Sequence, residues 1–188
     1  MKKIIVVCML IQLLFGCVPV FIVGAAVGGV AVYEGRNATI KKRDFDLTSR
    51  ISRRLNQNSE LREHSRIMVS AYDGVVLLAG QTPTATLREE AYDLAKDTPG
   101  IRRLYNEITI SGPISSLTQS SDTWITTKVK SVLLATKGLD SSQIKVVTEN
   151  GIVYLLGKVT HHQAEIAADA ARTVGGVQKV VTLFEFLR

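Results

Sequence analysis

The chain of 188 residues has few of the side chains on which covalent and metal chemistry depend. Its only two cysteines, Cys8 and Cys17, lie near the start, so nothing downstream can form a disulfide or a thiolate metal site. Gly-x-Ser-x-Gly, P-loop and His-Glu-x-x-His motifs are all absent. These absences argue against the common hydrolase, nucleotide-binding and zinc-peptidase classes. We expect a protein that is not an enzyme, with no catalytic residues, no cofactor and no metal ion.

The arrangement of the three histidines and the few aromatic residues argues against a metal site and against nucleic-acid binding. His161 and His162 are adjacent, so on a helix they point about 100° apart and cannot chelate one ion together. His64 stands alone in a polar segment. Aromatic residues make up only 6% of the chain, and its basic residues are not interleaved with them, which argues against nucleic-acid binding.

The composition is that of a folded protein with a basic surface. Hydrophobic residues make up 46% and charged residues 21%, which is typical of globular domains. The length suits one medium domain or two small ones. The net charge is +6 and the pI is about 9.4, which favours an anionic partner such as phospholipid.

The first residues have the layout of a secretory signal. Lys2 and Lys3 are followed by a largely apolar run from Ile4 to Leu14 and then by Leu14-Phe15-Gly16-Cys17. This ending resembles a bacterial lipobox. The resemblance implies that residues 1–16 are a signal peptide cleaved after Gly16, and that Cys17 is diacylated and then N-acylated. Residues 17–44 would then form the lipidated cysteine and its tether, and Cys8 would leave with the signal.

An uncleaved signal anchor is the alternative for this segment. Ile4 to Tyr33 is long and apolar enough to span a bilayer, which takes about 20 residues. Pro19 and the glycines at 24, 28 and 29 disfavour one continuous helix. Val18 follows the cysteine where an aspartate would retain a lipoprotein in the inner membrane, so the resemblance implies the outer membrane.

The rest of the chain contains one sequence twice. Asp46 to Ile110 aligns with Asp122 to Phe186, and the apolar positions recur together. The matched residues include Leu47, Ile51 and Leu55 with Ile125, Val129 and Leu133, and Asp73-Gly74 with Asn150-Gly151. We therefore predict a first domain at 45–111, a serine-rich linker at 112–121 and a second domain at 122–188.

Each repeat is predicted to run helix, strand, strand, helix, strand. Asp-Gly and Asn-Gly between two β-prone runs are strong hairpin signals, because both allow positive φ. Asp122 is the expected N-cap of the second repeat's opening helix. The expected elements are helices at about 46–56, 84–97, 123–136 and 161–174, and strands at about 67–72, 75–79, 103–110, 144–148, 152–156 and 179–187.

Three stretches carry a family resemblance. Leu77-Leu78-Ala79-Gly80 and Leu155-Leu156-Gly157-Lys158-Val159 follow the hairpins, and the second repeat opens with Asp122-Thr123-Trp124-Ile125-Thr126-Thr127-Lys128-Val129. Both repeats resemble the BON domain, and the whole resembles the dual BON-domain outer-membrane lipoproteins, the DolP family. The implied fold class is α+β: two tandem BON domains, each αββαβ, with a three-stranded mixed sheet covered by two helices.

The family resemblance also implies a function. It implies an outer-membrane lipoprotein, anchored in the periplasmic leaflet, whose second BON domain binds anionic phospholipid through its first helix. The expected lipid is phosphatidylglycerol or cardiolipin. The implied role is envelope integrity at division sites. The alternative is a protein-interaction adaptor for envelope assembly or peptidoglycan-remodelling factors.

Helical spacing gives the opening helix of the second repeat two different sides. Ile125, Val129 and Leu133 fall on one side, which should face the sheet. The other arc supplies the expected phospholipid-binding residues, which are Trp124, Thr127, Lys128, Lys130, Ser131 and Leu134. Tryptophan prefers the bilayer interface, and lysines gain energy near anionic headgroups. In the alternative interpretation, Trp124 and Leu134 pack against the first repeat.

Two further features of the repeats call for a structural explanation. The first repeat's opening helix carries Arg50, Arg53 and Arg54 on its outward side, which indicates a solvated or electrostatic face. Gly80 and Gly157 end the second strand of each repeat. We predict a structural role for both glycines, because a side chain there would meet the neighbouring helix.

Overall fold

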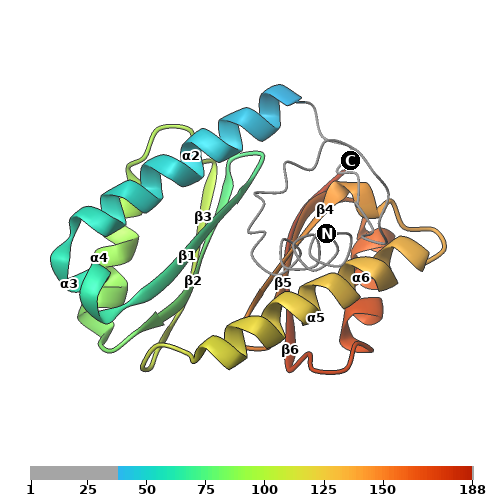
Figure 1. The fold of residues 1–188 in the computed structure, drawn as a ribbon. Helices are drawn as coiled ribbons and strands as arrows, with labels where there is room; N and C mark the ends of the chain where they lie inside the picture. Colours follow the sequence, from blue (N-terminus) through green and yellow to red (C-terminus); the bar gives the residue numbers. More distant parts are fainter. Residues whose placement is uncertain (1–37, 188) are drawn as a thin grey trace, which may run out of the picture. The chain divides into compact units, whose positions relative to one another are not determined.

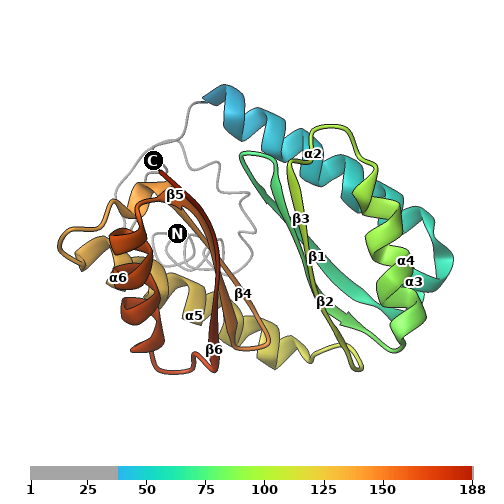
Figure 2. The same cartoon turned by 180° about the vertical axis from the view of Figure 1, so that it is seen from behind.

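The computed structural model describes residues 38–187, all within one compact unit of the chain (Figures 1 and 2). The predicted signal peptide, Cys17 and the tether up to residue 37 lie outside the described residues. Within 38–187, no helix combines the length and apolar character that crossing a membrane requires.

Two copies of the same order of elements follow one another. Module one (residues 38–110) comprises α2 (Ala38–Gln57), α3 (Ser59–His64), β1 (Arg66–Tyr72), β2 (Val75–Thr82), α4 (Ala85–Lys96) and β3 (Arg103–Ile110). Module two (residues 116–187) comprises α5 (Ser116–Ala135), a 3₁₀ turn η1 (Ser141–Gln143), β4 (Ile144–Glu149), β5 (Ile152–Val159), α6 (His161–Arg172) and β6 (Lys179–Phe186). Apart from the short α3 and η1, each module is αββαβ, as predicted.

Each module contains one mixed three-stranded sheet. The strand orders are β1-β2-β3 and β4-β5-β6; the first pair in each is antiparallel and the second parallel. The predicted hairpins are confirmed at Asp73-Gly74 and Asn150-Gly151. All four turn residues have positive φ, between 45° and 76°. A two-residue turn of this kind needs positive φ at both positions, which aspartate, asparagine and glycine tolerate best.

A buried aspartate on the opening helix of each module holds the hairpin turn. The Asp44 carboxylate accepts hydrogen bonds from the backbone N–H groups of Asp73 (2.8 Å) and Gly74 (3.1 Å). The Asp122 carboxylate accepts the same pair of bonds in module two, at 2.7 and 2.8 Å. Asp44 is therefore the counterpart of Asp122. The predicted alignment of Asp46 with Asp122 was two residues out, and Asp46 instead corresponds to Trp124.

Both opening helices begin well before the predicted residues. We expected starts near Asp46 and Thr123, with Asp122 as an N-cap, but α2 begins at Ala38 and α5 at Ser116. The N-cap of α5 is Ser115, whose side chain accepts from the Thr118 N–H at 3.2 Å. The serine-rich sequence was misleading because serine favours turns in isolation. Much of the predicted linker is therefore helix.

The apolar residues form three clusters that define layers. One cluster lies between α2, α3, α4 and the first sheet, and a second between α5, α6 and the second sheet. The third joins the two sheets and consists of Tyr72, Val75, Leu77 and Ala79 with Val147, Tyr154, Leu156 and Leu183. We call this sheet-to-sheet contact the seam. Alternate residues of β2 thus face the helices or the seam, and the helices of each module cover only the other face of its sheet (Figures 1 and 2).

The seam also contains a buried polar network. Glu149 of β4, only 4% exposed, forms an ion pair with Arg66 of β1. The same carboxylate accepts from the Gln81 side-chain amide at 2.9 Å. The Gln81 carbonyl in turn accepts from the backbone N–H of Ile114, at 3.4 Å, in the connection between the modules. Glu149 and Gln81 thus tie both modules and their connection together.

Gly80 and Gly157 lie where a strand approaches its partner too closely for a side chain. A Cβ atom on Gly80 would collide with the backbone carbonyl of Arg66, and one on Gly157 with that of Gln143. Both obstacles are backbone beside the antiparallel partner strand. The prediction that the neighbouring helix would be the obstacle was therefore wrong, although the site is as crowded as expected.

Tyr154 should ionise at a higher pH than an ordinary tyrosine. Burial in the seam raises its pKa to about 12, and the negative charges of Glu107 and Glu149 add to the rise. The folded-state pKa lies above the ordinary value of 10.0, so ionisation of Tyr154 destabilises the folded protein. The contribution of the neutral phenol to the stability of the fold is therefore complete below pH 10.0 and is lost as the pH rises through about 12. Absorbance titration at alkaline pH should show a late step that Tyr154→Phe removes. A parent titration without this step would contradict the prediction.

Candidate functional site

The helix α5 presents a buried side and a bare apolar side. Ile125, Val129 and Leu133 are at most 2% exposed in the core of module two. Trp124 and Leu134, on the outward side, are 57% and 52% exposed. Neither belongs to the seam, whose apolar residues come from the strands. The alternative in which these two side chains pack against the first repeat was therefore wrong.

Leu117 extends the bare side and was missed from the sequence. It lies seven residues before Trp124, about two helical turns, so both point to the same side. At 81% it is the most exposed large apolar side chain of residues 38–187. The segment had been interpreted as linker, although Leu117, Trp124 and Ser131 recur every seven residues. We call the outward residues Leu117, Trp124, Thr127, Lys128, Lys130, Ser131 and Leu134 the outer stripe.

Within the outer stripe, a lysine lies over the indole ring. The Lys128 Nζ is 3.3 Å from the centroid of the Trp124 ring, one helical turn away. A cation over an aromatic face gains electrostatic energy from the ring quadrupole. The stripe therefore combines a positive charge and an amphipathic ring at one point, as predicted from the residue types alone.

The hydroxyl groups of the outer stripe are already satisfied by the helix. Thr127 donates to the Thr123 carbonyl at 3.1 Å, and Ser131 donates to the Thr127 carbonyl at 3.0 Å. Ser120 and Thr123 make the same bond to the residue four positions earlier, each at 3.1 Å. A bonded hydroxyl costs less to move out of water than a free one. The side chains between the apolar residues are thus suited to a partly dehydrated surface.

The histidines do not gather into a site in the described part of the chain. Within residues 38–187, no group of three or more His, Cys, Asp or Glu side chains is placed to hold a metal ion. The His161 ring stacks on Phe186, with centroids 3.9 Å apart and planes 7° from parallel. This contact explains His161 as part of the packing of α6 on β6.

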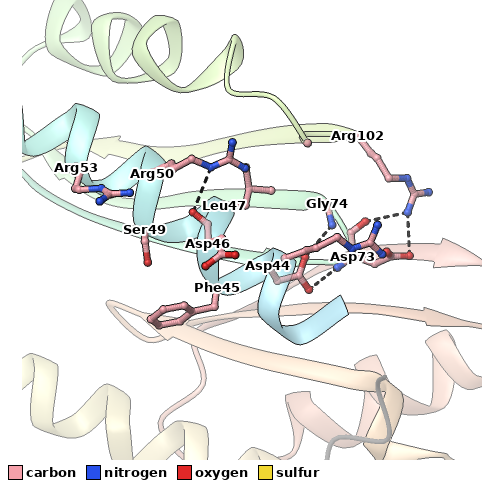
Figure 3. A pocket seen from close by; sticks show the side chains of 12 residues that line it. Asp44, Phe45, Asp46, Leu47, Ser49, Arg50, Arg53, Asp73, Gly74 and Arg102 are labelled. Carbon is pink, nitrogen blue, oxygen red and sulfur yellow. Dashed lines mark hydrogen bonds and ion pairs between the residues drawn. The ribbon is translucent and has the colours of Figure 1, made fainter. Parts of the chain in front are cut away.

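A second candidate site lies on module one. A cleft of about 680 Å³ opens beside the middle of α2 and the Asp73-Gly74 turn (Figure 3). Arginines from α2 and from the segment before β3 line it, as does Phe45. Arg50 and Arg53, expected to lie on a solvated or electrostatic face, thus belong to the wall of a concave site.

Comparison with known proteins agrees with this architecture. Both modules match the BON domain, at residues 43–112 and 121–188. The chain is 36% identical over 172 residues to the outer membrane lipoprotein DolP of Haemophilus influenzae, covering 92% of this chain and 89% of that protein. The chain belongs to the DolP family of outer-membrane lipoproteins with two BON domains.

Two further relatives are similar over more than two thirds of the chain. The 21 kDa hemolysin of Actinobacillus pleuropneumoniae is 41% identical over 153 residues, covering 81% of this chain and 79% of that protein. Osmotically-inducible protein Y of Escherichia coli K12 is 28% identical over 142 residues, covering 73% and 69%. Each match covers more than two thirds of the relative, so the similarity extends across both modules.

Proposed function

We propose that the protein is anchored by a diacylated Cys17 in the periplasmic leaflet of the outer membrane and binds anionic phospholipid through the outer stripe of α5. Its role would be to support envelope integrity, in particular at division sites. Family membership supports the location, and one observation carries the binding site. Trp124 and Leu134 are left bare beside lysines, on a helix whose other side is fully buried.

The chemistry of the outer stripe matches the layers of a bilayer surface. Trp124 suits the headgroup level, where an indole keeps its apolar body and its N–H both satisfied. Leu117 and Leu134 can enter the acyl boundary on either side of it. Lys128 and Lys130 can each gain about 1 kcal/mol near anionic headgroups. Phosphatidylglycerol and cardiolipin provide that charge.

Acidic substitutions in the outer stripe should abolish lipid binding. We expect the fragment from residue 38 onward to float with vesicles that contain phosphatidylglycerol and to stay behind with neutral vesicles. Trp124→Glu combined with Leu134→Glu should reduce binding about tenfold or more, because both side chains would then carry charge into the interface. The Trp124 emission of the parent, which is unambiguous because it is the only tryptophan, should shift to the blue with phosphatidylglycerol vesicles and not with neutral vesicles.

The control is an acidic change at an exposed aromatic residue elsewhere. Tyr92→Glu on α4 of module one changes a side chain that is 37% exposed and lies outside the outer stripe. Its binding should match the parent. The proposal fails if the parent binds neutral and anionic vesicles equally, or if the double variant still floats.

Leu117 should contribute to the same binding. Leu117→Glu should weaken association with anionic vesicles several-fold, because the most exposed leucine would no longer enter the acyl boundary. Folding should be unaffected, since the side chain makes little contact with the core. Vesicle titration of this variant beside Tyr92→Glu, which lies outside the outer stripe, is the measurement. Equal binding by both variants and the parent would restrict the lipid contact to Trp124 onward.

A further inference from the structure

The duplication provides an internal comparison for the cleft on module one. Because Asp44 and Asp122 hold equivalent turns, the residues around them can be matched position by position. Arg43, Arg50, Arg53 and Arg102 of module one stand where module two has Ser121, Lys128, Ser131 and Gln178. Trp124, the centre of the outer stripe, is replaced by Asp46. Thus three positions that hold neutral polar side chains in module two hold arginines in module one. Module one also lacks the large apolar side chain that Trp124 provides in module two.

The cleft has a floor and walls formed by three separate segments. The middle of α2, the Asp73-Gly74 turn and the segment from Gly100 to Arg102 line about 680 Å³ (Figure 3). Phe45, 71% exposed, lines it as well. This volume is in the range of small-molecule sites and exceeds what a single inorganic ion fills.

Most of the carboxylates in the cleft are already engaged, and so is Arg102, which also pairs with Glu185 at 2.7 Å. Asp44 is occupied by the turn amides, and Asp73 pairs with Arg102 at 3.1 Å. Arg50 donates only to backbone carbonyls, those of Pro99 (3.0 Å) and Asp46 (3.4 Å).

Three guanidinium groups of the cleft have no carboxylate in the described part of the chain as an ion-pair partner. Among residues 38–187, no carboxylate forms an ion pair with Arg43, Arg50 or Arg53. Asp46 is the one carboxylate of the lining without a bonding partner among these residues. The cleft is left with an excess of positive charge.

We propose that this cleft binds a phosphate group carried by a small organic moiety. The guanidinium fork matches two phosphate oxygens at once, and Arg43 and Arg53 are free to supply it. Arg50 adds a third positive charge, and the Phe45 ring offers an apolar surface to the organic part. The same phosphate chemistry occurs on a soluble phosphate ester and on a phospholipid headgroup. Module one would thus bind by charge and module two by insertion.

The first experiment measures saturable binding of a free phosphate ester. The full chain in neutral detergent should show a thermal midpoint that rises with the logarithm of the glycerol phosphate concentration above the dissociation constant, relative to chloride at equal ionic strength. Arg43→Gln with Arg53→Gln should weaken the apparent affinity about tenfold or more, since two charge-assisted contacts are lost. Arg62→Gln with Arg88→Gln removes the same charge from module one outside the cleft and should leave the affinity unchanged.

The second experiment identifies the source of the phosphate. The same glycerol phosphate titration is carried out with the chain in phosphatidylglycerol nanodiscs and in nanodiscs made equally anionic with a fatty acid, so that both surfaces repel the ester alike. A lower affinity in the phosphatidylglycerol discs would support the site with a lipid headgroup as its occupant, and equal affinities would support it with a soluble ester. The Trp124→Glu and Leu134→Glu variant should bind glycerol phosphate like the parent, which separates this site from the outer stripe.

The proposal is overturned by any of four results. Glycerol phosphate could give no rise in the thermal midpoint beyond the chloride control. The Arg43 and Arg53 variant could bind as well as the parent, or the Arg62 and Arg88 control could lose as much affinity. Loss of binding in the α5 variant would also overturn it, because the phosphate would then be bound by the outer stripe.

Discussion

Replacing Gly157 by alanine is expected to cost about 3 kcal/mol or more and to lower the thermal midpoint by about 6–12 °C. The added Cβ would collide with the carbonyl of Gln143, at the start of the antiparallel pair between β4 and β5. Backbone cannot rotate away as a side chain can, so the strands must separate. Circular dichroism during thermal and urea unfolding is the measurement.

Gly175 provides the matched control for this prediction. A Cβ there would have no heavy atom within 4 Å, and its φ is not in the left-handed region. Gly175→Ala should therefore change stability by no more than about 0.5 kcal/mol. Gly80→Ala should cost at least as much as Gly157→Ala, because φ at Gly80 is also +134°. Equal stability of the Gly157 and Gly175 variants would contradict the steric explanation.

The hairpins were the part of the fold most directly predictable from sequence. The turns at Asp73-Gly74 and Asn150-Gly151 can be predicted from the local sequence, because tolerance of positive φ is a property of the residues themselves. Once the turns are placed, the alternation of the flanking strands and the alanine-rich helices follow. The internal repeat then confirms each assignment with its counterpart, since both copies must adopt one fold.

The helix starts could not be predicted, because the deciding interactions are not local. The carboxylates of Asp44 and Asp122 point to hairpins 28–30 residues away, so a residue that reads as an N-cap is buried inside a helix. The outer stripe was found only from Trp124 onward for this reason. Leu117 belonged to it but stood in a serine-rich stretch that favours turns.

The seam was signalled only in part by the sequence. The unbroken apolar runs in β2 and β5 are typical of strands covered on both faces, which requires something to cover the second face. Only the structure shows that the other module covers this second face. Glu149 has two partners in the seam: Arg66, which lies 83 residues away in the sequence, and Gln81, which lies 68 residues away. No local pattern links positions so far apart.

Replacing Arg66 by alanine should destabilise the protein more than replacing Glu149 by alanine. Without Arg66, the Glu149 carboxylate stays buried with only Gln81 as a partner, and such an uncompensated charge costs about 3–5 kcal/mol. Without Glu149, the Arg66 side chain, 33% exposed, can still reach water. That change leaves mainly the Gln81 amide unsatisfied, at about 1–3 kcal/mol. Urea unfolding of both variants gives the comparison.

A second substitution distinguishes buried charge from lost packing. Glu149→Gln in the Arg66→Ala background should recover much of the lost stability, because a neutral amide is cheaper to bury than a carboxylate. Arg62→Ala, which removes an exposed ion pair with Glu63, should cost no more than about 1 kcal/mol. If the second substitution recovers nothing, the loss comes from the packing of the Arg66 stem. In that case the need for Arg66 at the contact between the modules would not come from the charge of Glu149.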